Sequence, residues 1–260
     1  MPTATRDGVR LYYEKEGDGS PPMVFVHGWT CDHSYFVPQV EHFRKTHSTV
    51  TLDLRGHGMS DPSPVTYGID VLADDVAWLC ETLKLDHPVI MGHSLGGAVV
   101  LELAARHPAL PRAIVTIEFT VARTPELTAS LHALVEGLHS DAFEVVRDQF
   151  IAALFLDTDD RERREKIIKQ MSSCPQEISA ALLTGFVEWD GRIAARALTV
   201  PALHISATGD ADDTKTLQAL NPLFQSAVTV GAGHFNQLFA ADQVNAMVEQ
   251  FLRVSVHLTP

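Results

Sequence analysis

Short apolar runs alternate with amphipathic helical segments along most of this 260-residue chain. The apolar runs that we expect to form strands lie at residues 22–28, 48–56, 87–94, 112–119, 200–206 and 227–234. Runs that are apolar without alternation are typical of strands buried on both faces of a parallel sheet. Between two of them, residues 67–85 place Leu72, Val76, Leu79 and Leu83 on one helical face. The pattern predicts βαβ units and an α/β fold.

The two ends of the chain and one long internal segment depart from this alternation. Residues 8–17 are typical of an antiparallel edge strand, and residues 235–254 of a closing helix. From 119 to 198 there is no convincing strand, but several helical stretches follow one another. We therefore expect a core formed by 1–118 and 199–260, with a helical insertion at 119–198.

Composition narrows the possible partners and cofactors. The chain has 33 acidic and 20 basic residues, and a net charge of -13 makes it a poor binder of phosphate backbones, so we expect no nucleic-acid partner. No stretch approaches the roughly 18 apolar residues of a membrane span, and no secretory signal begins the sequence, so we expect a cytoplasmic protein without a membrane partner. Cys31, Cys80 and Cys174 are far apart, which predicts neither disulfides nor a zinc site. We expect no metal or other cofactor.

A G-x-S-x-G pattern is formed by Gly92, Ser94 and Gly96. An apolar strand-like run precedes it and a helix-prone run follows it, which is the context that this motif requires. A sharp turn from strand to helix exposes the serine hydroxyl above the sheet, and the positive end of the helix favours a developing anion there. We interpret Ser94 as a nucleophile rather than a serine in a glycine-rich turn.

A serine nucleophile needs a base, and the base needs an acid to orient it. If the chain order is serine, acid, histidine, the candidate bases are His107, His132, His139, His204, His234 and His257. His234 differs from the others because it follows the last predicted strand, where a loop can hold its imidazole over the serine. We predict His234 as the base.

Four motifs together resemble the α/β-hydrolase superfamily: HGW at 27–29, DLRGHGMSD at 53–61, GHSLGG at 92–97 and GAGHF at 231–235. The resemblance implies an eight-stranded, mostly parallel sheet flanked by helices. It also implies a helical cap over the site, to which the insertion would correspond. Two backbone N–H groups, those of Trp29 and Leu95, would then form the oxyanion hole.

The acid has two candidates. Family spacing after the strand at 200–206 indicates Asp210, although Ala207 stands where most relatives have glycine. Glu118 lies 118 − 94 = 24 residues after the nucleophile, a position that serves as the acid in some relatives such as the zearalenone-type lactonases, but more often holds a structural carboxylate. We prefer Asp210 and keep Glu118 as the alternative.

These features predict a cofactor-free serine hydrolase that cleaves a small carboxylic ester or lactone through an acyl-enzyme. A carbon–carbon bond hydrolase or an enol-lactonase of the same fold is the alternative. A non-catalytic ligand-binding protein and a cofactor-free dioxygenase are less favoured. Apolar rings next to the motifs or in the insertion are expected to line the substrate pocket: Trp29, Phe119, Trp189 and Phe235. The motifs do not indicate the substrate or the oligomeric state.

Overall fold

The computed structural model describes residues 2–63, 67–121, 123–207 and 211–256, with only the backbone described at 211–212. Its strands form one eight-stranded sheet in the order β1-β2-β4-β3-β5-β6-β7-β8. The strands are β1 Thr3–Arg6, β2 Val9–Glu16, β3 Met23–Val26, β4 Thr49–Leu52, β5 Val89–His93, β6 Ala113–Ile117, β7 Ala202–Ser206 and β8 Phe224–Val228. The pairs β1–β2 and β2–β4 are antiparallel and the others are parallel. The predicted α/β-hydrolase architecture with a mostly parallel sheet is confirmed.

The central strands are buried over their whole length. Every residue of β3, β4, β5, β6 and β7 is buried, as expected for apolar runs covered on both faces. Strand β8 lies at the sheet edge, and only its first residue, Phe224, is buried. The strand expected over 227–234 was placed too late in the chain. Strand β8 spans Phe224–Val228, and the residues that follow it form the loop that carries His234.

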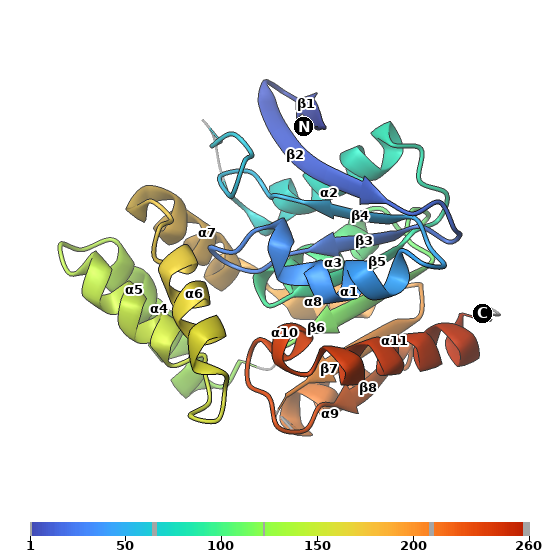
Figure 1. Ribbon diagram of the computed structural model, residues 1–260. Helices are drawn as coiled ribbons and strands as arrows, with labels where there is room; N and C mark the ends of the chain where they lie inside the picture. Colours follow the sequence, from blue (N-terminus) through green and yellow to red (C-terminus); the bar gives the residue numbers. More distant parts are fainter. Residues whose placement is uncertain (1, 64–66, 122, 208–210, 257–260) are drawn as a thin grey trace.

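Helices cover both faces of the sheet (Figure 1). On one face, α1 (Val37–Phe43) and α11 (Ala241–Ser255) pack Phe43, Val248 and Phe251 against the apolar strand residues. On the other face, α2 (Ile69–Thr82), α3 (Leu95–Arg106) and α8 (Gly191–Ala197) cover the alternate strand residues. Three further short elements are the 3-10 helix η1 (His33–Phe36), α9 (Ala211–Leu220) and α10 (Asn236–Phe239). Among the described residues, no helix is long and apolar enough to cross a membrane.

Between β6 and β7 the chain forms a group of four helices that stands apart from the sheet (Figure 1). They are α4 (Pro125–Leu138), α5 (Phe143–Ala152), α6 (Arg161–Met171) and α7 (Gln176–Glu188). We call these four helices the cap. The expected insertion at 119–198 also included α8, but α8 packs against α3 and belongs to the layer that covers the sheet.

Candidate active site

Ser94 occupies the turn between β5 and α3, with backbone angles φ 54° and ψ −122°. A positive φ is strained for a residue with a side chain. The Ser94 N–H donates a 2.8 Å hydrogen bond to the Ile117 carbonyl of β6, which holds the turn. A Cβ on Gly92 would lie 2.1 Å from the Gly96 carbonyl oxygen, and one on Gly96 would lie 2.2 Å from the Val26 carbonyl oxygen. Both glycines are therefore required for this tight turn.

Glu118 and His234 meet at the carboxyl end of the sheet. The Nδ1 atom of His234 lies 3.6 Å from Oε2 of Glu118, and 21% and 18% of the two side chains are exposed. The other carboxylate oxygen, Oε1, accepts a hydrogen bond from the Ala207 N–H just after β7. The Glu118 N–H donates to the Ile205 carbonyl at 2.9 Å, and its φ is 49°. The carboxylate is thus held between the imidazole and the end of β7.

Asp210, the acid preferred from the sequence, lies outside the described residues. Its neighbour Asp213 is buried in α9, where Oδ1 accepts a 3.0 Å hydrogen bond from the Val121 N–H. Asp213 therefore anchors the segment that leads from β6 toward the cap.

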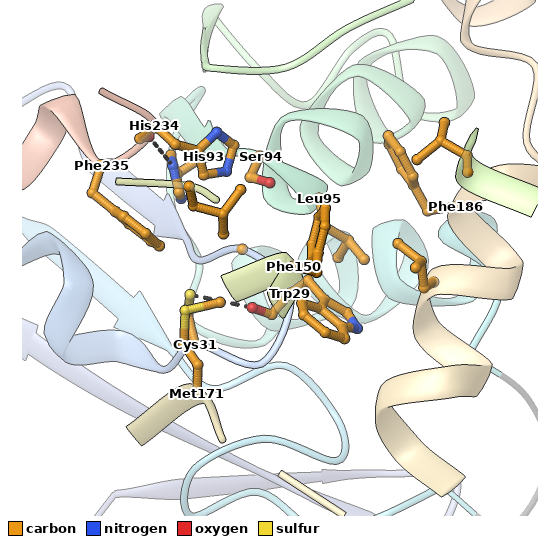
Figure 2. Close-up of a pocket in the computed structure, with 14 residues that line it drawn as sticks. Trp29, Cys31, His93, Ser94, Leu95, Phe150, Met171, Phe186, His234 and Phe235 are labelled. Carbon is orange, nitrogen blue, oxygen red and sulfur yellow. Dashed lines mark hydrogen bonds between the residues drawn. The ribbon is translucent and has the colours of Figure 1, made fainter. Parts of the chain in front are cut away.

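Ser94 and His234 line one cavity of about 80 Å³, together with the predicted oxyanion residues Trp29 and Leu95 (Figure 2). A Cβ on Gly28 would lie only 3.2 Å from Cβ of Ser94, so the loop after β3 runs directly beside Ser94. Leu95 is the first residue of α3, and the first N–H groups of a helix have no acceptor within the helix. These positions are compatible with an oxyanion hole beside Ser94.

Neutral histidines hold the loop that carries Gly28 and Trp29. The Nε2 atom of His27 accepts a 3.0 Å hydrogen bond from the Leu54 N–H, so Nδ1 is protonated and donates to the Gly28 carbonyl at 2.8 Å. His57 Nε2 accepts from the backbone N–H of the residue after Trp29 at 3.2 Å. Burial lowers the pKa of His27 and lowers that of His57 to about 3, so both rings remain neutral acceptors.

The predicted aromatic pocket residues separate into two groups. Trp29 and Phe235 line the cavity, whereas Phe119 and Trp189 do not. The rings of Phe119 and Trp189 pack against each other with centroids 6.0 Å apart, and Trp189 Nε1 donates to Glu102 Oε2 at 2.8 Å. Phe119 and Trp189 therefore pack beside α3 and are not among the residues that line the cavity with Ser94.

The cap supplies the apolar wall that sequence reasoning did not identify. Its four helices and the turn after α5 contribute the remaining large side chains of the cavity, which are Leu131, Phe150, Leu154, Met171, Leu183 and Phe186. The cap is held over the core by Trp29, whose Nε1 donates to the Ser179 carbonyl of α7 at 2.8 Å and whose ring contacts Phe150 edge-on at 5.5 Å. Helical periodicity identifies the buried side of each cap helix, but it does not indicate which buried residues face an internal space.

His93 lies between Gly92 and Ser94 in this turn, and no sequence pattern indicates a role for it. Its Nε2 donates to the backbone carbonyl of His234 at 2.7 Å, and the two rings lie 4.8 Å apart (Figure 2). His93 is buried, and burial holds its pKa well below the usual range, so Nδ1 carries a lone pair. Within the described residues this Nδ1 has no hydrogen-bond partner. A neutral His93 therefore connects the turn that carries Ser94 to the backbone of the predicted base.

One group of side chains in the described part of the chain has metal-ligand spacing: Asp32, His33 and Asp53. These side chains already have hydrogen-bond partners within the protein. Asp53 Oδ1 accepts from the backbone N–H and from Nδ1 of His33, each at 2.8 Å, and Asp32 Oδ1 accepts from the Ser34 N–H at 2.9 Å. The hydrogen bond to Asp53 raises the pKa of His33. None of the three residues lines the cavity with Ser94. We interpret the group as support for the loop that follows β3.

Comparison with known proteins agrees with this geometry. Residues 21–241 match the model of the alpha/beta hydrolase fold family. A 2-(acetamidomethylene)succinate hydrolase from Mesorhizobium japonicum is 35% identical over 139 residues, which cover 54% of this chain and 49% of that protein. The chain thus spans about half the length of this curated relative.

Two solved structures are similar over nearly the whole chain. An enol-lactonase from Burkholderia xenovorans LB400 has a TM-score of 0.82 at 25% identity and covers 96% of this chain and 99% of its own. A thermophilic esterase from Thermogutta terrifontis has a TM-score of 0.83 at 26% identity, with coverage of 98% and 97%. With the motifs, the sheet order and the family match in agreement, this chain belongs to the alpha/beta hydrolase fold family.

Proposed function

We propose that this protein is a serine hydrolase that cleaves a small carboxylic ester or lactone, with Ser94 as nucleophile and His234 as base. Two features together carry the proposal. The strained serine turn shares one cavity with His234, and the half-buried carboxylate of Glu118 lies 3.6 Å from the His234 ring. An unusual backbone conformation at a serine is typical of a nucleophile elbow. The similarity to an esterase and to an enol-lactonase supports the same class of reaction.

In the proposed mechanism, Ser94 Oγ attacks the substrate carbonyl while His234 accepts its proton. Because Nδ1 of His234 faces Glu118, the proton is taken by Nε2. The N–H groups of Trp29 and Leu95 stabilise the oxyanion. The tetrahedral intermediate collapses, the alcohol leaves with the proton from His234, and the acyl group stays on Ser94. Water, deprotonated by His234, then releases the acid and restores Ser94.

We propose Glu118 as the acid, in place of the earlier preference for Asp210. Three contacts support this proposal: the approach of Oε2 to His234, the hydrogen bond from the Ala207 N–H to Oε1, and the bond from the Glu118 N–H to Ile205. They fix the carboxylate where it can stabilise an imidazolium. Asp210 lies outside the described residues, so the two carboxylates are compared by mutation in the Discussion.

The test of the proposed function is the Ser94→Ala variant. We expect kcat for short esters and lactones to fall at least about 10⁴-fold, because only the hydroxyl can form the acyl-enzyme. A fluorophosphonate should modify the wild-type protein at Ser94, as peptide mass spectrometry would show, and should leave the variant unmodified. Ser48→Ala removes another buried serine hydroxyl, just before β4, and is the matched control. Modification at a different residue, or full activity of Ser94→Ala, would contradict the proposal.

A further inference from the structure

The cavity beside Ser94 is walled mainly by hydrocarbon. The cap side chains that face it are leucine, phenylalanine and methionine only, and Trp29, Leu95 and Phe235 add further apolar surface from the core (Figure 2). The titratable lining groups are His93, His234 and Cys31. Burial raises the pKa of Cys31 well above its usual range, so the thiol is uncharged.

No lysine or arginine lines the cavity, and the residues outside the described ranges contain neither. Arg123 lies behind one wall, with its guanidinium carbon 4.7 Å from the centroid of the Phe186 ring. Its two terminal nitrogens donate to the carbonyls of Val187 and Phe186, each at 2.7 Å. The cation is therefore already bonded to the cap backbone and is not offered to a substrate.

The size of the cavity limits what it can hold. At about 80 Å³ it has roughly half the volume of an engineered cavity of about 150 Å³ that binds benzene. A chain of a few carbon atoms fits such a space, whereas a long acyl chain needs the cap to move. After the alcohol has left, the acyl group is the part of the substrate that stays bonded to Ser94.

We infer that the substrates of this site carry a short, uncharged, apolar acyl group, and that the site discriminates against acyl groups that end in a carboxylate. This inference rests on the proposed serine-hydrolase function. A carboxylate moved into an apolar space without a partner loses its hydration, which costs several kcal/mol. A branched alkyl group of the same shape has no such hydration to lose, and it gains contacts with the leucine and phenylalanine side chains of the wall.

The first experiment compares ethyl 4-methylpentanoate with monoethyl succinate. The two acyl groups have the same shape, but one ends in an isopropyl group and the other in a carboxylate. We expect kcat/KM at pH 7, measured by acid release, to be at least about 100-fold higher for the neutral ester. Equal rates, or a preference for monoethyl succinate, would overturn the inference.

The second experiment changes the length of the acyl chain and the size of the cavity. For wild type we expect kcat/KM to fall by about tenfold or more between ethyl butanoate and ethyl decanoate. Phe150→Ala removes a cavity wall on α5, and Leu183→Ala does the same on α7, so each should shift the preferred chain toward longer esters. Val145→Ala, on the same helix as Phe150 but 59% exposed, should leave the preference unchanged. A preference that does not move in either cavity variant would overturn the inference.

Modification of Ser94 by a fluorophosphonate separates this inference from the proposed function. Modified Ser94 with a preference for anionic or long acyl groups would overturn only the substrate class. No modification of Ser94 and no turnover of any ester would overturn the proposed function and the substrate class together.

Discussion

Glu118 carries its carboxylate from the end of β6 to the ring of His234, across the end of the neighbouring strand β7. In the proposed mechanism, a carboxylate in this position stabilises the imidazolium that forms when Ser94 loses its proton. A carboxamide of the same shape still accepts the hydrogen bond from the Ala207 N–H, but its NH₂ group faces the N–H of the imidazole or forces the wrong tautomer. The two functions of Glu118, structural and electrostatic, can therefore be separated.

We expect Glu118→Gln to lower kcat by about 10⁴-fold with little change in melting temperature. Asp210→Asn is the matched comparison, because it removes the charge of the other candidate acid, and we expect it to cost far less activity. Steady-state kinetics and thermal melts of both variants measure this ranking. A larger loss for Asp210→Asn would return the role of the acid to Asp210.

His93 provides a second prediction for single residues, because its Nε2 holds the backbone carbonyl of the predicted base at 2.7 Å. Without this bond the imidazole of His234 is positioned less accurately over Ser94, and a displacement of about 1 Å can cost about 100-fold in rate. We expect His93→Leu to lower kcat by about 10- to 100-fold while KM changes little. His93→Gln, whose amide nitrogen can reach the same carbonyl, should restore much of the rate. Equal kcat values for the leucine variant and wild type would show that His93 only fills space.

The site residues differ in how far the sequence could indicate them. Ser94 and His234 stand in local motifs, so their places could be proposed without a structure. The choice between Glu118 and Asp210 depends on which side chain reaches across the ends of two strands, and sequence spacing does not determine that reach. The hydrogen bond from His93 joins residues 141 positions apart, so no local pattern indicates it.

Whole elements were predicted best where burial is complete. The strands from β3 to β7 read as apolar runs because both faces are covered, whereas β8 has one buried residue and no comparable signal. The short strand β1 has no buried residue and was missed for the same reason. Helix α8 was assigned to the insertion because it follows the cap in the chain, although it packs on α3. The apolar pattern of a single sequence indicates which residues are buried, but it does not indicate which element they pack against.

Between elements, Asp74 joins α2 to the end of α3. It accepts hydrogen bonds from Arg106 Nε at 2.9 Å and Nη2 at 2.8 Å, and from His107 Nε2 at 2.8 Å. These partners, Arg106 above all, lower the pKa of Asp74 to about 2. Because the pKa is lower in the folded state, the stabilisation is present above the unfolded pKa near 4 and is lost as the pH falls toward 2.

We expect Asp74→Asn to lower the free energy of unfolding at pH 7 by about 1 kcal/mol, with a smaller difference at pH 3. Urea unfolding of wild type and variant at the two pH values measures this difference in the free energy of unfolding. Asp86→Asn is the control, because Asp86 lies just beyond α2 with 88% of its side chain exposed. A difference that is the same at pH 7 and pH 3 would contradict the assigned role of the charge.

The stability of the whole molecule depends on histidines that are buried without charge. Burial lowers the pKa of His27, His57 and His93 in the folded protein, so unfolding at mildly acidic pH takes up protons. The stabilisation is complete above the unfolded pKa near 6.5 and declines as the pH falls below it. The pKa of His33 is raised in the folded protein, so its contribution to stability is complete below pH 6.5 and is lost only as the pH rises above that value. His33 therefore does not offset the decline at acidic pH.

We expect the free energy of unfolding to fall by about 3 to 4 kcal/mol per pH unit below pH 6, the slope for two to three protons. Urea titrations at pH 7.5, 6.0 and 5.0 measure the slope. His57→Gln should reduce the slope by the contribution of one proton, whatever the effect of the substitution on stability at pH 7.5. An unfolding free energy that stays constant from pH 7.5 to 5.0 would contradict this account.

The cap leaves the sheet after β6 and the chain returns at β7, and these two strands are neighbours in the sheet. Because β6 and β7 are parallel, the chain leaves at the carboxyl end of β6 and must cross to the amino end of β7, and α8, which packs on α3, lies on that return path. The sheet therefore sets no requirement on the length or sequence of the segment between β6 and α8. Doubling such a connection adds only about 0.6 kcal/mol of closure entropy. The cap helices of a related protein could therefore replace those between β6 and α8. Substrate selectivity could then change by recombination while the turn that carries Ser94 stays the same.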